Sequence, residues 1–253
     1  MLIIIENMPL EKILKIHAKL RDQIIERSPQ LTNLENSLFG FILLKSFNYC
    51  FNTYKGIGLL LPKLYYEQAS LLLRAFWECN LTLHYIERSP EDRSAQFAEY
   101  SLIDFVKTLP KEERKQFEAA FHNRLRKYEI ASKPNRSCAK YAKTWSGLDL
   151  KSMADELSDP WPFEYSKIYR LASQYTHGAP GAILIANEGF NGDFSKVIDH
   201  DKKRSAVVAI SSIDIMIRLC RLIGKYSENK DTAFLQDIES SLACALRNGD
   251  CSS

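Results

Sequence analysis

A charged pair lies inside one of the most apolar stretches of the chain, the segment LLLRAFWE that ends at Glu78. Arg74 and Glu78 are four residues apart, so on a helix they share one face and can form an ion pair. A helix that is apolar on nearly all faces is normally buried, and a buried charge is costly unless it is paired. Two interpretations follow. The pair either orders the core or forms the polar floor of an active site.

A second group of polar residues lies in the segment YRLASQYTHG, which ends at Gly178. Arg170 and His177 are seven residues apart, which is about two helical turns, so both project from one face with Ser173 between them. His177 precedes the glycine that ends the helical pattern. The negative end of a helix raises the affinity of an imidazole for a proton. The alternative interpretation is a helix-end histidine with no catalytic task.

The spacing of Arg170 and His177, in a chain that reads as all-helical, resembles the R-x(4–6)-H motif of the HEPN superfamily. This resemblance implies a helical bundle that cleaves RNA without a metal ion and often works as a dimer. Arg74-x-x-x-Glu78 followed by Ser173-x-x-x-His177 and a glycine is also similar to an uncharacterised bacterial helical family. That second resemblance implies no known activity.

The HEPN resemblance implies a specific reaction. The 2′-hydroxyl of RNA attacks the adjacent phosphorus and leaves a cyclic phosphate and a free 5′-hydroxyl. His177 is expected to act as general acid or base, and Arg170 to brace the doubly charged phosphorane. Glu78 is expected to orient one of these side chains, and Ser173 to donate to a phosphate oxygen. The resemblance also implies a toxin or phage-defence role, a homodimer, and an antitoxin or defence partner protein.

A basic stretch runs from His122 to Lys143 and contains a single acid, Glu129. Tyrosines are interleaved with its cations, and Trp145 follows it. Single-stranded nucleic acid contacts such surfaces through its phosphates and stacked bases, whereas the alternative is a solvated charge run. The candidate RNA contacts are Arg124, Arg126, Lys127, Arg136, Lys140 and Lys143.

Other kinds of chemistry have little support in the sequence. It holds no Walker loop, G-x-G-x-x-G, G-x-S-x-G or H-E-x-x-H motif, so we expect no cofactor and no metal ion. The net charge of +3 is too small to imply nucleic-acid binding by itself, so a basic surface requires local clustering. The six cysteines form no C-x-x-C pair, which favours free thiols in a reducing compartment over a disulfide framework.

The elements that position these residues are expected to be helices. Apolar residues recur at helical spacing through most of the chain, and ten Gly and nine Pro are few for an all-β fold. We expect one all-α domain, a multi-helix bundle over residues 1–253, with an irregular junction at 131–147. The predicted helices cover residues 10–24, 36–54, 63–87, 90–109, 111–130, 148–157, 164–177, 201–226 and 230–247.

Two local expectations complete the architecture. A Gly/Asn-rich turn between residues 182–186 and 194–198 predicts a small β-hairpin. The apolar stretch 38–61 is interrupted by polar side chains every turn or two, so it is expected to be a buried helix and not a membrane span. A cytoplasmic protein without membrane contact follows as the expectation.

Three classes of function remain open from the sequence. The leading hypothesis is a metal-independent endoribonuclease, which needs Arg170 and His177 in a shared open cleft. A non-catalytic helical module that binds a protein or nucleic acid through the basic stretch predicts a buried His177. A small-molecule or nucleotide sensor predicts a closed apolar pocket beside Arg74 and Glu78.

Overall fold

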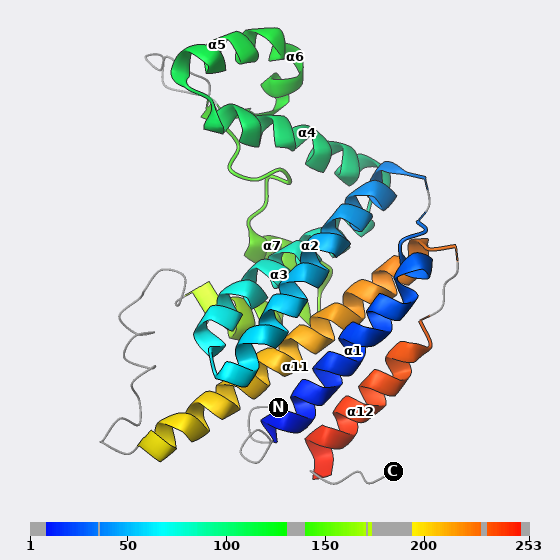
Figure 1. Cartoon of the computed structure of the whole chain (residues 1–253). Coiled ribbons are helices and arrows are strands. Elements are labelled where there is room, and N and C mark those ends of the chain that lie inside the picture. Colours follow the sequence, from blue (N-terminus) through cyan, green and yellow to red (C-terminus); the bar gives the residue numbers. More distant parts are fainter. Residues whose placement is uncertain are drawn as a thin grey trace.

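The computed structural model describes residues 9–34, 36–130, 140–170, 172–173, 194–228 and 232–248. Over these residues the chain is all-α, as the sequence predicts, with one pair of two-residue strands (Figure 1). No helix in the described ranges combines the length and the apolar character needed to cross a membrane. The main helices are α1 (Leu10–Leu31), α2 (Leu38–Leu60), α3 (Tyr66–Glu87), α7 (Leu150–Leu157), α11 (Phe194–Tyr226) and α12 (Phe234–Asn248).

These six helices form the bundle, whose core is a single cluster of apolar side chains. The short 3-10 turn η2 (Leu61–Lys63) joins α2 to α3, which lie side by side, and α11 packs against α1, α2 and α3. α12 covers α1 on the other side (Figure 1). Trp77 and Phe76 of α3 are completely buried in this core, so α3 is the central helix that the charged pair interrupts.

The predicted end of the second helix at residue 54 is wrong, because α2 continues through Gly56 and Gly58 to Leu60. Gly58 lies against the buried ring of His17, and an added Cβ would be 2.8 Å from His17 Cε1. His17 stacks on Tyr54 at 3.8 Å between ring centroids. The glycine therefore serves close helix packing, and the burial of its neighbours outweighs its low helix propensity.

A smaller region, the lobe, extends from the bundle (Figure 1). It contains α4 (Pro90–Thr108), α5 (Lys111–Ala120), α6 (His122–Leu125), the 3-10 turn η3 (Arg126–Tyr128), and the antiparallel strands β1 (Glu129–Ile130) and β2 (Lys140–Tyr141). Tyr100, Ile103 and Val106 belong to its own apolar cluster. Trp145 packs against both this cluster and the bundle core. The predicted single helix over 111–130 is instead broken at Phe121 into α5 and the short α6, and it ends before η3 and β1. The chain turns at Phe121 so that α6 and η3 pack back on α4.

The predicted hairpin near residues 182–198 is not supported at its second arm. Residues 194–198 are the first turns of α11, whose pattern of apolar residues continues into the bundle, whereas residues 182–186 lie outside the described ranges. The one strand pair that is described is β1 with β2; β1 directly precedes the predicted irregular junction and β2 lies within it. The predicted helix over 164–177 is helical wherever it is described, as α8 (Trp161–Glu164), the π-helical turn η4 (Tyr165–Tyr169), and residues 170 and 172–173.

Candidate functional site

Arg74 and Glu78 form the ion pair that their spacing predicts, and Arg74 also reaches a distant segment. Arg74 Nε donates to Glu78 Oε1 at 2.9 Å, and Arg74 Nη2 donates to the Tyr169 hydroxyl at 3.1 Å. Burial acts to lower the pKa of Arg74, but the hydrogen bonds with Glu78 and Tyr169 outweigh it and raise that pKa. The side chains keep 21% and 35% of their surface exposed, so the pair lies at the edge of the core and a ligand can reach it.

The segment that carries Tyr169 is shaped by the π-helical turn. The Tyr169 ring stacks on Tyr165 at 5.2 Å and lies 5.2 Å from the Trp77 ring. Burial raises the pKa of Tyr169, and the charge of Glu78 adds to this effect. Single π-turns inside α-helices are frequent at functional sites. The aromatic stack fixes the tyrosine hydroxyl that accepts from Arg74.

The described segment places Ser173 beside Tyr169 and leaves Arg170 exposed. Ser173 Oγ donates to the Tyr169 carbonyl at 2.8 Å, so its single proton is used locally and Oγ remains an acceptor. Among the described residues of this segment, Tyr169 and not Arg170 forms a hydrogen bond with Arg74. His177 lies outside the described residues, so the shared cleft of Arg170 and His177 stays a prediction.

A buried acid supports this arrangement, and sequence reasoning missed it. Glu164 is 6% exposed. It accepts from Trp77 Nε1 at 2.9 Å and from Arg218 Nη2 at 2.6 Å. Burial raises the pKa of Glu164, and the Arg218 charge opposes that shift. Arg218 also pairs with Asp214 at 3.1 Å. The sequence signal for this acid is Arg218, which lies in an apolar stretch of α11. A buried arginine needs a paired acid, as argued for Arg74, so the same reasoning predicts a buried acid for Arg218.

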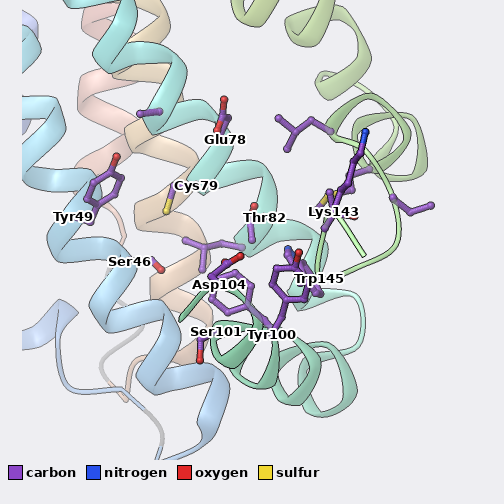
Figure 2. A pocket seen from close by; sticks show the side chains of 17 residues that line it. Ser46, Tyr49, Glu78, Cys79, Thr82, Tyr100, Ser101, Asp104, Lys143 and Trp145 are labelled. Carbon is purple, nitrogen blue, oxygen red and sulfur yellow. The ribbon is translucent and has the colours of Figure 1, made fainter. Parts of the chain in front are cut away.

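A cavity of about 490 Å³ opens beside Glu78, between α2, α3, α4 and the segment after β2 (Figure 2). Tyr49 comes from α2, Glu78 from α3, Tyr100 from α4, and Lys143 and Trp145 from the segment after β2. Glu78 therefore both pairs with Arg74 and lines the cavity. The volume lies within the range of about 300–1,000 Å³ that is usual for small-molecule sites.

The basic stretch is less free than its sequence indicates. Arg124 lies 3.8 Å from Glu99 of α4, and Lys127 pairs with the same carboxylate. Glu99 is far upstream, so counting acids within the stretch could not reveal it. Arg126 and Lys143 are exposed, and Lys143 lines the cavity. These two are the candidate RNA contacts with the best support.

The remaining basic candidates add little to the interface. Lys140 lies in β2 opposite Ile130, and Arg136 lies outside the described residues. The basic surface is therefore defined here by Arg126 and Lys143, together with two further exposed cations, Arg124 and Lys127, that share one acid.

A second recess of about 500 Å³ lies at the far end of α3. Glu87 Oε1 accepts from Lys225 at 2.7 Å, and His84 Nδ1 lies 3.6 Å from Glu87 Oε2. The hydrogen bond from His84, with Lys225, lowers the pKa of Glu87 to about 2. His84 Nε2 is buried and has no hydrogen-bond partner among the described residues. This network anchors the end of α3 to α11.

No group of three or more His, Cys, Asp or Glu side chains within the described ranges is arranged to hold a metal ion. Cys50, Cys79 and Cys220 are free thiols. Cys244 is disulfide-bonded, so the expectation of free thiols is wrong at that position. Disulfide formation depends on how the fold places two Cβ atoms, which sequence spacing does not determine.

One family model matches residues 40–193, and its description is a family of unknown function, DUF5677. The comparisons with curated proteins and with solved structures found no match. The matched segment covers more than half of the chain and contains the charged pair, the lobe, the cavity-lining residues and the segment from Tyr169 to His177. The chain therefore belongs to the DUF5677 family.

Proposed function

We propose that this chain is a metal-independent endoribonuclease of HEPN type, with its active site where Arg74 of α3 meets Tyr169, eight residues before His177 in the sequence. The observation that supports it most is the hydrogen bond from Arg74 Nη2 to the Tyr169 hydroxyl at 3.1 Å. This bond joins the R-x-x-x-E pair to the segment that carries Ser173 and, four residues later in the sequence, His177.

Arg74 is well suited to brace a phosphate in this proposal. Its Nε and Nη2 are engaged by Glu78 and Tyr169, which fixes the guanidinium plane and leaves Nη1 for a ligand. A planar guanidinium with a fixed orientation is the best protein donor to phosphate oxygens. Arg170 is exposed on the segment that carries Tyr169. Its guanidinium provides a second cation for contact with the phosphates of the RNA chain.

The proposed reaction is an internal transesterification. The ribose 2′-oxygen forms a bond to phosphorus, the bond from phosphorus to the 5′-oxygen breaks, and the 2′-hydroxyl proton leaves as the 5′-oxygen gains one. His177 transfers one of these protons. Arg74 stabilises the charge that develops on the phosphorane, and Glu78 holds Arg74 in place. The products are a 2′,3′-cyclic phosphate and a 5′-hydroxyl.

The test is incubation of purified protein with total RNA in the presence of EDTA, followed by analysis of the new RNA ends. We expect cleavage that yields cyclic phosphate and 5′-hydroxyl ends, and its loss in His177→Ala. His200→Ala, which removes a histidine of α11 that lies outside the basic stretch, is the matched control and should cleave normally. Cleavage that survives His177→Ala, or is lost on addition of EDTA, contradicts the proposal.

The resemblance to HEPN proteins extends the proposal to a cytoplasmic toxin or phage-defence effector that acts as a homodimer with an antitoxin or defence partner. Light scattering during size-exclusion chromatography tests the dimer directly. A monomer that cleaves RNA would remove the dimer from the proposal and keep the reaction.

A second candidate function, a small-molecule or nucleotide sensor, is favoured by the cavity beside Glu78. In that case a ligand binds there and no RNA is cleaved. The same cleavage assay separates the two functions, because a sensor binds its ligand and leaves the RNA ends unchanged.

A further inference from the structure

Aromatic side chains from α2, α4 and the segment after β2 line part of the cavity beside Glu78. Trp145 makes T-shaped contacts with Phe97 at 5.4 Å and with Tyr85 at 5.8 Å between ring centroids. These contacts fix the indole, which is only partly buried and lines the cavity. Tyr49 and Tyr100 contribute further aromatic surface (Figure 2). A rigid aromatic ring at the side of a cavity is a stacking platform for a flat ligand.

The charged groups of the cavity define what such a flat ligand must carry. Glu78 and Asp104 are the acids among the lining residues, and Lys143 is the cation among them. Glu78 Oε1 accepts from Arg74, and Asp104 Oδ1 accepts from Lys107 at 3.0 Å. Ionised carboxylates only accept hydrogen bonds, so the ligand must present N–H or O–H donors to them. The exposed ammonium of Lys143 favours an anionic group at the mouth.

We propose that this cavity binds a guanine nucleotide, with the base stacked on Trp145, its Watson–Crick edge on Asp104 and a phosphate on Lys143. Guanine carries adjacent N1–H and N2–H donors, which match the two oxygens of one carboxylate. Adenine and cytosine offer one amino group on that edge, and uracil offers a single imino N–H. Glu78 keeps its ion pair with Arg74 in this arrangement.

The guanine has two potential sources, a residue of an RNA chain or a free nucleotide. The first source rests on the proposed function, since the nucleotide in the cavity then places the neighbouring phosphate at Arg74 and directs cleavage to guanine sites. The second corresponds to a sensor. The chemistry of recognition is the same in both.

Tryptophan fluorescence provides a direct measurement. Trp77 and Trp161 are buried, so quenching by a stacked base reports on Trp145. The full chain is titrated with GMP, AMP, CMP and UMP, and separately with short RNAs that contain or lack guanosine. We expect the tightest binding for GMP and for guanosine-containing RNA. Trp145→Phe should lose the fluorescence signal, so the binding of GMP to this variant is measured by calorimetry.

Asp104→Asn tests the assigned base contact. It preserves the size of the side chain, and we expect it to weaken GMP binding about tenfold or more, since a bidentate pair is lost. The matched control is Asp155→Asn, because Asp155 pairs with Lys151 at 2.6 Å as Asp104 pairs with Lys107, but does not line the cavity. Thermal melting of each variant confirms that it folds.

The outcomes separate this inference from the proposed function. Binding of GMP without cleavage of RNA supports the guanine site with a free nucleotide as its ligand and contradicts the nuclease. Cleavage without guanine preference, equal binding of all four nucleotides, or unchanged GMP affinity in Asp104→Asn overturns the guanine site and leaves the nuclease standing.

Discussion

Two arginine–glutamate pairs with identical spacing lie in different regions of the molecule. Arg74 and Glu78 belong to the bundle, and Arg114 and Glu118 to the lobe. The distance from Nε to Oε1 is 2.9 Å in the first pair and 2.8 Å in the second. Both pairs are largely shielded from solvent, so local geometry alone does not distinguish them.

Each pair also holds a tyrosine from a distant segment. In the bundle Tyr169 accepts from Arg74 at 3.1 Å. In the lobe the Arg114 guanidinium lies 5.8 Å from the Tyr141 ring centroid, and burial, with Glu118, raises the pKa of Tyr141. The difference is that a cavity opens beside the bundle pair. An R-x-x-x-E pair therefore holds a distant tyrosine in either region. The cavity beside the bundle pair makes that pair a candidate site.

The largest loss of stability is expected from removing a buried carboxylate of the bundle, and a small one from removing an exposed carboxylate of the lobe. Glu164→Ala leaves Arg218 in the core without its main partner, so we expect the free energy of unfolding to fall by about 3–5 kcal/mol. Glu112→Ala removes the exposed partner of Lys115 in the lobe and should change it by less than about 0.5 kcal/mol. Urea unfolding measures both. Equal losses would erase the distinction between the regions.

The two arginine–glutamate pairs should differ in activity. Arg74→Ala removes the guanidinium that faces the proposed scissile phosphate, and we expect RNA cleavage to fall about 100-fold or more. Arg114→Ala removes its counterpart in the lobe and should leave the rate within about twofold of the parent. Initial rates on one labelled RNA check this. A comparable loss in both variants would indicate a purely structural role for each pair.

The acid stability of the chain should depend on the bundle histidine. Burial, with the nearby charge of Arg21, lowers the pKa of His17 to about 3. The unfolded chain binds a proton below about pH 6.5 and the folded chain does not, so this stabilisation is complete above that pH. It is lost as the pH falls toward 3, by about 1.4 kcal/mol per pH unit.

The matched variants are His17→Phe, which should flatten that part of the pH profile, and His122→Gln in the lobe, which should leave it unchanged. Urea unfolding at several pH values between 4 and 7 provides the profiles. An unaltered slope in His17→Phe would show that His17 is protonated in the folded state.

The smallest effect concerns the packing of the bundle. Gly58→Ala puts a Cβ 2.8 Å from a ring atom of His17, and we expect a net loss of about 1 kcal/mol after the gain in helix propensity. Gly56→Ala meets the flexible end of Leu72 at 3.1 Å and should be neutral or stabilising. The midpoints of thermal unfolding compare them. A stabilised Gly58→Ala would mean that the His17 ring moves freely.

The sequence predicts the fold class and the Arg74–Glu78 pair, because both depend on local spacing. Apolar periodicity places most helices, and an i,i+4 interval determines which side chains share a face. It does not predict the partners of Glu164, since those contacts depend on how α8 packs against α3 and α11. Glu99 as the shared acid of the basic stretch was missed for the same reason. Long-range pairing needs the tertiary arrangement, which local patterns do not contain.

The π-helical turn from Tyr165 to Tyr169 has a consequence for the gene as well as for the protein. Its hydrogen bonds span one residue more than those of an α-helix, so the turn accommodates one amino acid in excess. Deletion of one codon at the exposed Ser166 or Lys167 would convert the π-turn into a regular α-helical turn. The residues before and after it would keep their helical faces. Homologues one residue shorter at this point can thus retain the same facing surfaces.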